Sequence, residues 1–386
     1  MLKFAAILFI QVLCGMEMDL FVPSFPELQH VFNLTPAMVQ LTISANYITL
    51  CICSLLTGAL GDRYNRRTVL LLGLCIFVLG SFLCVIAPNY LALISGRILQ
   101  GVGIAAPAIL SFPILLEDCQ KDKQPGMMGT INGVKTLAMA IAPVIGSFVN
   151  LYFSWRGNFS ILLGMGVLCL ATSFFFVPSN EGDKNASLSL QTYVPLLTSQ
   201  KFLIVVFSLG LITAGYWLFL AMAPIFYMEG MAVPLKHFGY YQGSLTLTFA
   251  FISIMSPQIL KTFGQKKCLH FGLGACFVCT MLILGMALLQ IHQPLIITSV
   301  LILLSAAIVF PFNIVYPLSL EILPNTKGRS AGLVQAVDLV LTASLIEIAA
   351  YFYNGQFLSI GFSMFISIML SLTFIQVAIN KKWLII

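Results

Sequence analysis

The chain has 386 residues, of which 59% are hydrophobic and 8% charged, and its net charge is +6. Soluble proteins carry about a quarter charged residues, so a chain of this composition cannot bury its apolar side chains in a water-soluble core. The composition excludes a soluble enzyme, a nucleic-acid-binding protein and a disordered adaptor, and it predicts a protein that crosses a membrane many times.

Twelve apolar stretches of membrane-spanning length follow one another along the chain. A helix needs about 20 apolar residues to cross a bilayer, and these stretches lack the alternating pattern of barrel strands. We therefore predict an all-α membrane protein with about twelve transmembrane helices. The predicted spans are residues 4–22, 38–60, 69–87, 90–116, 127–150, 157–177, 202–228, 238–260, 268–290, 294–316, 328–352 and 356–379.

A polar segment divides these spans into two groups of six, and weak internal repeats relate the two groups. Gly73 and Gly272 follow similar polar loops at an offset of 199 residues, and Pro113 and Pro317 recur at an offset of 204. Many transporters are built from duplicated halves, so we predict two pseudo-symmetric six-helix bundles. The predicted domains are residues 1–178, a cytoplasmic linker over 179–201, and residues 202–386.

The distribution of Lys and Arg predicts how the chain lies in the membrane. With the N-terminus in the cytoplasm, fifteen of the 19 basic residues fall on the cytoplasmic side, and only Arg156 and Lys236 fall outside. Cytoplasmic loops of membrane proteins carry an excess of Lys and Arg. Both termini are therefore predicted to be cytoplasmic.

Six ionisable side chains fall within the predicted spans. Each costs about 2.5–3.5 kcal/mol at the centre of a bilayer, so such groups normally face a partner or a water-filled cavity. Four acids against two bases leave two carboxylates without a basic partner, and an unpaired carboxylate removed from water exchanges protons near neutral pH. This pattern predicts proton coupling. The six are Glu17, Asp19, Arg97, Lys135, Asp338 and Glu347.

Depth along the helices brings some of these groups together. At 1.5 Å per residue, Glu17 and Asp19 lie about 20 Å along the first span, and Arg97 lies about 10 Å from the outer end of the fourth. An acid of the first span can therefore meet Arg97. Either this contact is a structural ion pair, or these three residues form the proton-coupling site; we predict the second.

Polar and aromatic residues within other spans are candidates for a substrate cavity, because they offer hydrogen bonds and stacking surfaces to a lipophilic or cationic ligand. Each can instead be a helix-packing contact or an interfacial anchor. No ATP-binding loop or metal-binding cluster is visible, so we expect no cofactor beyond a proton gradient. The candidates are Asn46, Tyr47, Gln100, Lys135, Tyr216, Trp217, Asn313, Tyr316, Gln335 and Asp338.

The loop after the second span carries a ten-residue motif, Gly-Ala-Leu-Gly-Asp-Arg-Tyr-Asn-Arg-Arg, over residues 58–67. It resembles the signature of the major facilitator superfamily, with Asn65 in place of a glycine. Asn tolerates the left-handed conformation that such a glycine adopts, so this departure from the signature is mild. The resemblance implies a cytoplasmic gating role for Gly58, Gly61, Asp62, Arg63, Arg66 and Arg67.

Further motifs resemble the Bcr/CflA-type drug–proton antiporters of that superfamily. Residues 19–26 resemble the end of their first span, and residues 93–103 resemble the motif whose Arg, here Arg97, is implicated in proton transfer. Their fifth-span motif is altered here to Ala-Met-Ala-Ile-Ala-Pro-Val-Ile-Gly, which keeps Pro143 and Gly146 for helix packing. Lys135 stands one turn earlier and favours an anionic ligand.

Together these patterns predict a non-enzymatic, monomeric carrier that exports small amphiphilic compounds or drugs from bacteria in exchange for protons. The resemblance implies alternating access in the inner membrane, with small-molecule substrate, protons and lipid as partners and no nucleic acid. A specific metabolite, peptide or siderophore carrier is the first alternative. A non-transporting receptor or scaffold on the same fold is the second.

Overall fold

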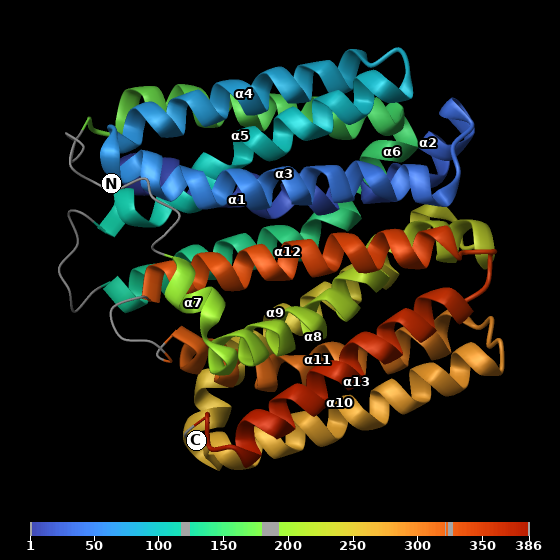
Figure 1. Cartoon of the computed structure of the whole chain (residues 1–386). Helices are drawn as coiled ribbons and strands as arrows, with labels where there is room; N and C mark the ends of the chain where they lie inside the picture. Colours follow the sequence, from blue (N-terminus) through green and yellow to red (C-terminus); the bar gives the residue numbers. More distant parts are fainter. Residues whose placement is uncertain (1, 117–123, 180–192, 321, 323–326, 385–386) are drawn as a thin grey trace. The chain divides into compact units, whose positions relative to one another are not determined.

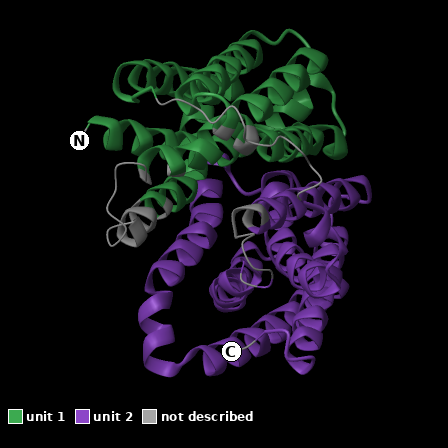
Figure 2. Ribbon diagram, turned by 60° about the vertical axis from the view of Figure 1, so that its left-hand side comes forward, with its two compact units in different colours: residues 1–189 green, residues 190–386 purple. Residues whose placement is uncertain are grey.

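The computed structural model describes residues 2–116, 124–179, 193–320, 322 and 327–384, and within these ranges the regular structure is entirely helical (Figure 1). The chain forms two compact units, Met1–Ser189 and Leu190–Ile386, which Figure 2 shows in separate colours. The prediction of an all-α membrane protein is confirmed.

The first unit contains five long helices and one short one. The longest, α6, spans two predicted transmembrane segments, and Ser154 lies within it at φ 56° and ψ −176°. At 1.5 Å per residue its 53 residues measure about 80 Å, enough for two crossings that reverse at this kink. The helices are α1 (Leu2–Asp19), α2 (Phe25–Phe32), α3 (Pro36–Arg63), α4 (Arg66–Ile86), α5 (Tyr90–Leu116) and α6 (Gln124–Phe176).

The second unit contains six long helices after a short α7. Most of the predicted linker, residues 180–192, lies outside the described residues, and α7 occupies part of the remainder. Helix α8 ends in a wider π-helical turn over Ile225–Gly230. The helices are α7 (Val194–Thr198), α8 (Gln200–Pro224), α9 (Leu235–Phe263), α10 (Gln265–Leu288), α11 (Pro294–Leu320), α12 (Lys327–Tyr351) and α13 (Leu358–Asn380).

Eleven helical segments in the described chain are long and apolar enough to cross a membrane. One of them, Gly133–Phe176, has 44 residues and includes the kink at Ser154, so it accounts for two predicted spans. The eleven segments therefore correspond to all twelve predicted spans.

The same glycine-to-proline contact joins corresponding helices of the two units. In the first unit a Cβ on Gly73 of α4 would lie 3.3 Å from Cδ of Pro107 on α5. In the second a Cβ on Gly272 of α10 would lie 2.8 Å from Cδ of Pro311 on α11. The offsets are 199 and 204 residues, as in the sequence repeats, so the contact supports a duplicated origin of the units.

Glycines also allow the first long helix of each unit to approach the fifth span of that unit closely. A side chain at Gly15 of α1 would collide with the backbone carbonyl of Lys135 on α6, and one at Gly146 would collide with the carbonyl of Leu20. In the second unit a Cβ on Gly210 of α8 would lie 3.5 Å from Cα of Asp338 on α12. Lys135 and Asp338 thus occupy corresponding places, each opposite a glycine.

Asn65 does not adopt the left-handed conformation that asparagine tolerates. Its backbone is extended, at φ −70° and ψ 121°, and its side-chain Oδ1 accepts a 2.9 Å hydrogen bond from the backbone N–H of Arg67. Only Tyr64 and Asn65 separate α3 from α4, and Tyr64 is extended as well. The residue therefore caps the N-terminus of α4, a role that Asn fills as readily as a turn.

Candidate functional site

A buried ion pair lies at the centre of the first unit. Nη1 of Arg97 on α5 is 2.9 Å from Oε1 of Glu17 on α1, and the two side chains are 0% and 2% exposed. The acid that meets Arg97 is thus Glu17. A charge-assisted hydrogen bond of this kind is strong because both groups are removed from water.

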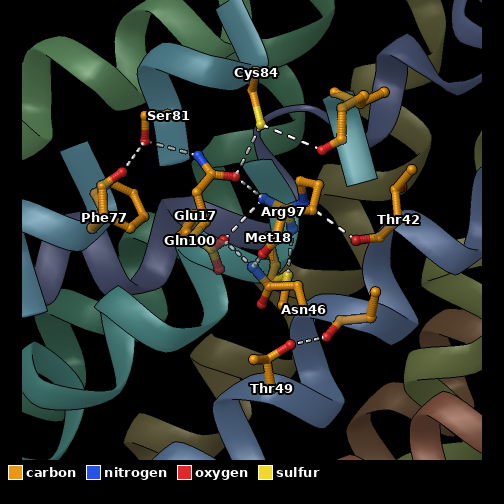
Figure 3. Close-up of polar contacts among 12 residues, drawn as sticks. Glu17, Met18, Thr42, Asn46, Thr49, Phe77, Ser81, Cys84, Arg97 and Gln100 are labelled. Atoms are coloured by element: carbon orange, nitrogen blue, oxygen red, sulfur yellow. Dashed lines mark hydrogen bonds and ion pairs between the residues drawn. The ribbon is translucent and has the colours of Figure 1, made fainter. Parts of the chain in front are cut away.

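Polar side chains from three neighbouring helices complete the network around this pair (Figure 3). Asn46 of α3 donates to Glu17 Oε1 at 2.9 Å and to the backbone carbonyl of Arg97 at 3.1 Å. Gln100 accepts from Arg97 Nη1 at 2.6 Å and donates to Ser81 of α4 at 2.8 Å. One network of hydrogen bonds therefore joins α1, α3, α4 and α5.

Two further contacts hold the guanidinium in place. Its Nε donates to the backbone carbonyl of Thr42 at 3.3 Å, and its Cζ lies 4.3 Å from the ring centroid of Phe21. A cation over an aromatic face is attracted by the ring's quadrupole, most strongly where water is excluded. Contacts to Nε, to Nη1 and to the face of the guanidinium therefore hold the Arg97 side chain within the first unit.

Glycines set the helix spacing that makes this network possible. A Cβ on Gly101 would lie 2.6 Å from the backbone oxygen of Asn46, and one on Gly80 would lie 2.7 Å from the backbone nitrogen of Gln100. Small residues at such positions let membrane helices approach until short polar side chains reach across. The close approach of α3 and α4 to α5 therefore positions Asn46 and Gln100.

Asp19 differs sharply from Glu17. Its side chain is only 6% exposed, yet within the described chain it makes no hydrogen bond or ion pair. The residue ends α1, two positions beyond Glu17, and so faces another direction. A carboxylate in this setting has no fixed counter-charge.

Two other predicted charges also lack an ionic partner among the described residues. Lys135 is half-buried on α6 and makes neither an ion pair nor a hydrogen bond there. Asp338 is half-buried on α12 and accepts a 2.5 Å hydrogen bond from the hydroxyl of Thr213 on α8. Neither charge belongs to the Glu17–Arg97 network.

The remaining predicted cavity residues are dispersed over the two units. Tyr47 is half-buried on α3, while Tyr216 is 1% exposed, stacks on Phe249 and accepts a hydrogen bond from Ser305 at 3.2 Å. Trp217 packs edge-on against Tyr216, with ring centroids 5.6 Å apart.

Three further candidates lie on α11 and α12. Asn313 donates to Ser256 at 2.8 Å, and Tyr316 stacks on Phe312 with a centroid distance of 5.5 Å. Gln335 is exposed on α12. Asn313 and Tyr316 thus already contact neighbouring side chains, whereas Gln335 is open.

The predicted gating motif lies where α3 turns into α4. Arg67 donates to the backbone carbonyl of Phe174, at the end of α6, at 2.5 Å. A Cβ on Gly61 would meet the side chain of Leu110 on α5, so α3 and α5 pack closely at this end of the motif. Arg63 is exposed and Arg66 is half-buried, whereas the surroundings of Gly58 and the side chain of Asp62 lie outside what the structure describes.

Sequence reasoning missed the hydroxyl partners of the charged groups. Ser81 supports Gln100, and Thr213 donates to Asp338, although neither residue stands out in the sequence. Ser and Thr commonly bond to their own helix carbonyls, so their type alone does not identify them. The weak signal available was Gly80 beside Ser81, since a glycine in a span predicts close helix approach.

Comparison with known proteins decides the family. A model of the Major Facilitator Superfamily matches residues 7–342. The chain belongs to the major facilitator superfamily. It is therefore a multi-pass integral membrane transporter and not an enzyme, as the sequence motifs predicted.

Its curated relatives are distant in sequence. It is 27% identical over 281 residues to a bicyclomycin resistance protein homolog of Haemophilus influenzae, an alignment that covers 71% of this chain and 70% of the relative. It is 23% identical over 266 residues to multidrug resistance protein MdtL of Salmonella typhimurium, covering 66% of each chain. The resemblance to this group of transporters is confirmed.

Solved structures establish the fold. A D-xylose–proton symporter superposes with a TM-score of 0.76 at 14% identity, covering 95% of this chain and 96% of the other. A peptide transporter crystallised with sulfate gives a TM-score of 0.78 at 12% identity, with coverages of 98% and 94%. At these identities the similarity concerns the fold alone.

Proposed function

We propose that the chain is a proton-coupled exporter of small amphiphilic compounds in the bacterial inner membrane. It works by alternating access as a monomer, with both termini in the cytoplasm and domains over residues 1–178 and 202–386 joined by a cytoplasmic linker. The relatives named for bicyclomycin and multidrug resistance support the substrate class. The excess of Lys and Arg on one side supports the orientation.

The unpartnered carboxylate of Asp19 is the observation that carries this proposal. Glu17 is paired with Arg97, so its charge is already balanced. Asp19 is as deeply buried but has no such balance among the described residues. A carboxylate in apolar surroundings is charged only when a cation accompanies it, and that cation is a proton or the substrate.

The coupling follows from this competition. A cationic substrate displaces the proton from Asp19 on the cytoplasmic side, and a proton from outside displaces the substrate after the cavity has reopened. Because a monovalent cation leaves as the proton enters, no net charge crosses the membrane, and the pH gradient drives the exchange with about 1.4 kcal/mol per pH unit, enough for about ten-fold accumulation. Arg97 and Glu17 hold α1 against α3 and α5 while α1 carries Asp19 between the two openings.

The test is dye transport by the purified chain in proteoliposomes under an imposed pH gradient, with ethidium as the cationic probe. We expect Asp19→Asn, which mimics the protonated carboxyl group, to abolish transport driven by the gradient and to weaken ethidium binding. Gly274→Ala is the matched control, because a Cβ there would meet no atom within 4 Å. Gradient-driven transport that survives in Asp19→Asn would rule out Asp19 as the coupling group.

Lys135 supports a second candidate, a carrier of a specific anionic metabolite. Its ammonium group lies in a membrane-spanning helix without an ionic partner in the described chain, and Ala138 and Ala142 replace the glycines of the antiporter motif. An anionic group on a substrate would balance the charge. Uptake of anionic substrates that is lost in Lys135→Gln and retained in Asp19→Asn would favour this carrier over the exporter.

We also propose roles for the remaining predicted side chains, in gating and in substrate binding. We assign the gating role to the loop between α3 and α4, where Arg67 ties α4 to the end of α6. The proposed substrate contacts are Asn46, Tyr47, Gln100, Lys135, Tyr216, Trp217, Asn313, Tyr316, Gln335 and Asp338.

A further inference from the structure

In the second unit the hydroxyl group of Thr213 has three possible acceptors, one of which is the carboxylate of Asp338, but only one proton to donate. The hydroxyl oxygen of Thr213 lies 2.5 Å from Oδ1 of Asp338, 2.8 Å from the carbonyl oxygen of Leu209 and 3.1 Å from that of Gly210. A hydroxyl group has one proton to donate and two lone pairs with which to accept. It can therefore donate to only one of these three oxygens at a time.

Each protonation state of Asp338 matches one orientation of this hydroxyl. When Asp338 is ionised, Thr213 donates its proton to Oδ1. When Asp338 carries a proton, Thr213 turns toward the carbonyl of Leu209, the usual acceptor for a helical Thr, and accepts from the carboxylic acid. Both arrangements use the same heavy-atom positions, so neither leaves the pair without a hydrogen bond.

We propose that Asp338 and Thr213 form a second proton-binding site, located in the second unit and separate from Asp19. One proton joins Oδ1 of Asp338 and cancels its negative charge, while the hydroxyl proton of Thr213 rotates from the carboxylate to the Leu209 carbonyl. No other bond forms or breaks. The site concerns proton binding itself, so it holds whether or not the chain exports drugs.

The surroundings provide no fixed positive charge for Asp338 within the described part of this unit. Helix α12 packs against α8, α11 and α13. The ionisable residues of α8 are Lys201, about 18 Å along the helix from Thr213, and Tyr216, whose hydroxyl already contacts Ser305. Tyr316 is the ionisable residue of α11, and α13 has none over Leu358–Asn380.

The charges on α12 itself are also distant. Glu347 and Tyr351 lie nine and thirteen residues beyond Asp338, about 14 and 20 Å along the helix axis. The side chains of Lys327 and Arg329 lie outside the described residues. Thr213 is consequently the group that responds when Asp338 gains or loses its proton.

The backbone holds the pair together. Gly210 faces α12, where a Cβ would lie 2.9 Å from Leu341 and 3.5 Å from Cα of Asp338, so the two helices approach closely one turn before Thr213. Asp338 is half-buried, whereas Thr213 is 6% exposed. The carboxyl group is thus accessible to a proton while its partner is fixed inside the unit.

Infrared difference spectroscopy of the purified chain between about pH 9 and about pH 5 tests the site without a substrate. A carboxylic acid has a carbonyl band that the carboxylate lacks. We expect one such band to disappear in Asp338→Asn and to persist in Asp19→Asn. In Thr213→Val the band moves to higher frequency because the acid loses its acceptor, and in Thr213→Ser it stays in place.

Thr280→Val is the matched control for Thr213→Val. Thr280 is also a buried threonine of the second unit, and its hydroxyl bonds at 2.6 Å to the carbonyl of Cys276 in its own helix. This variant should leave every acid band unchanged. If Asp338→Asn does not fold, ¹³C labelling of the Asp carboxyl groups in Asp19→Asn shows by the isotope shift that the band comes from an aspartic acid, and a frequency change in Thr213→Val but not in Thr280→Val assigns it to Asp338.

Two results would overturn the proposal. A spectrum in which no acid band depends on Asp338 means that this residue does not change its protonation state. A band that depends on Asp338 but has the same frequency in Thr213→Val means that the hydroxyl is not its partner. Loss of dye transport with an intact Asp338 band would instead concern the export mechanism at Asp19 alone.

Discussion

Removing the charge of Glu17 should destabilise the first unit strongly. Glu17→Gln keeps the shape of the side chain but leaves the guanidinium of Arg97, which is 0% exposed, without its counter-charge. Breaking a buried ion pair in this way costs about 3–5 kcal/mol. Gln100 and the ring of Phe21 still contact the guanidinium, so we expect the lower end, about 3 kcal/mol.

Thermal unfolding of the purified chain, followed by tryptophan fluorescence, measures this loss. Trp155 is 1% exposed in the first unit and reports its unfolding. For a unit of about 190 residues, 1 kcal/mol shifts Tm by about 2–4 °C, so Glu17→Gln should lower Tm by about 6–12 °C. Asp19→Asn is the control, because it removes a carboxylate with no partner in the described chain and should not lower Tm.

A double variant decides between the ion pair and a general packing defect. Arg97→Met removes the charge that Glu17→Gln leaves unbalanced, so the two changes together should cost less than the sum of the single changes. Additive losses, or an unchanged Tm in Glu17→Gln, would refute the argument that Arg97 depends on Glu17.

Two further predictions concern glycine packing and helix capping. Gly272→Ala should lower Tm, because its Cβ would lie 2.8 Å from Cδ of Pro311. Gly274→Ala on the same helix meets no atom within 4 Å, so its better helix propensity should add about 1 kcal/mol to the free energy of unfolding and raise Tm. Equal effects of the two variants in the same unfolding assay would contradict the packing argument. Asn65→Ala should cost about 1 kcal/mol by removing the cap of α4, and Asn65→Gly only a few tenths, because glycine is tolerated at this position. A larger loss in Asn65→Gly would show that Asn65 does more than cap α4.

Composition and periodicity by themselves determined the helices of this protein. A run of about 20 apolar residues has one stable form in lipid, since every backbone polar group must be satisfied within the segment. Spans and their number therefore followed directly from the sequence. The gap between the predicted spans 127–150 and 157–177 indicated the reversal, but only the structure showed that α6 makes it at one residue with positive φ, Ser154.

The sequence also determined that an acid on the first span meets Arg97, because depth along a helix is fixed by its rise per residue. Tertiary structure alone decided that this acid is Glu17. Residues 17 and 19 differ by about 200° around the helix, and the rotation of α1 depends on its contacts, including Gly15 against the carbonyl of Lys135. The same holds for Thr213 beside Asp338, since residues 125 positions apart meet only when two helices pack in one register.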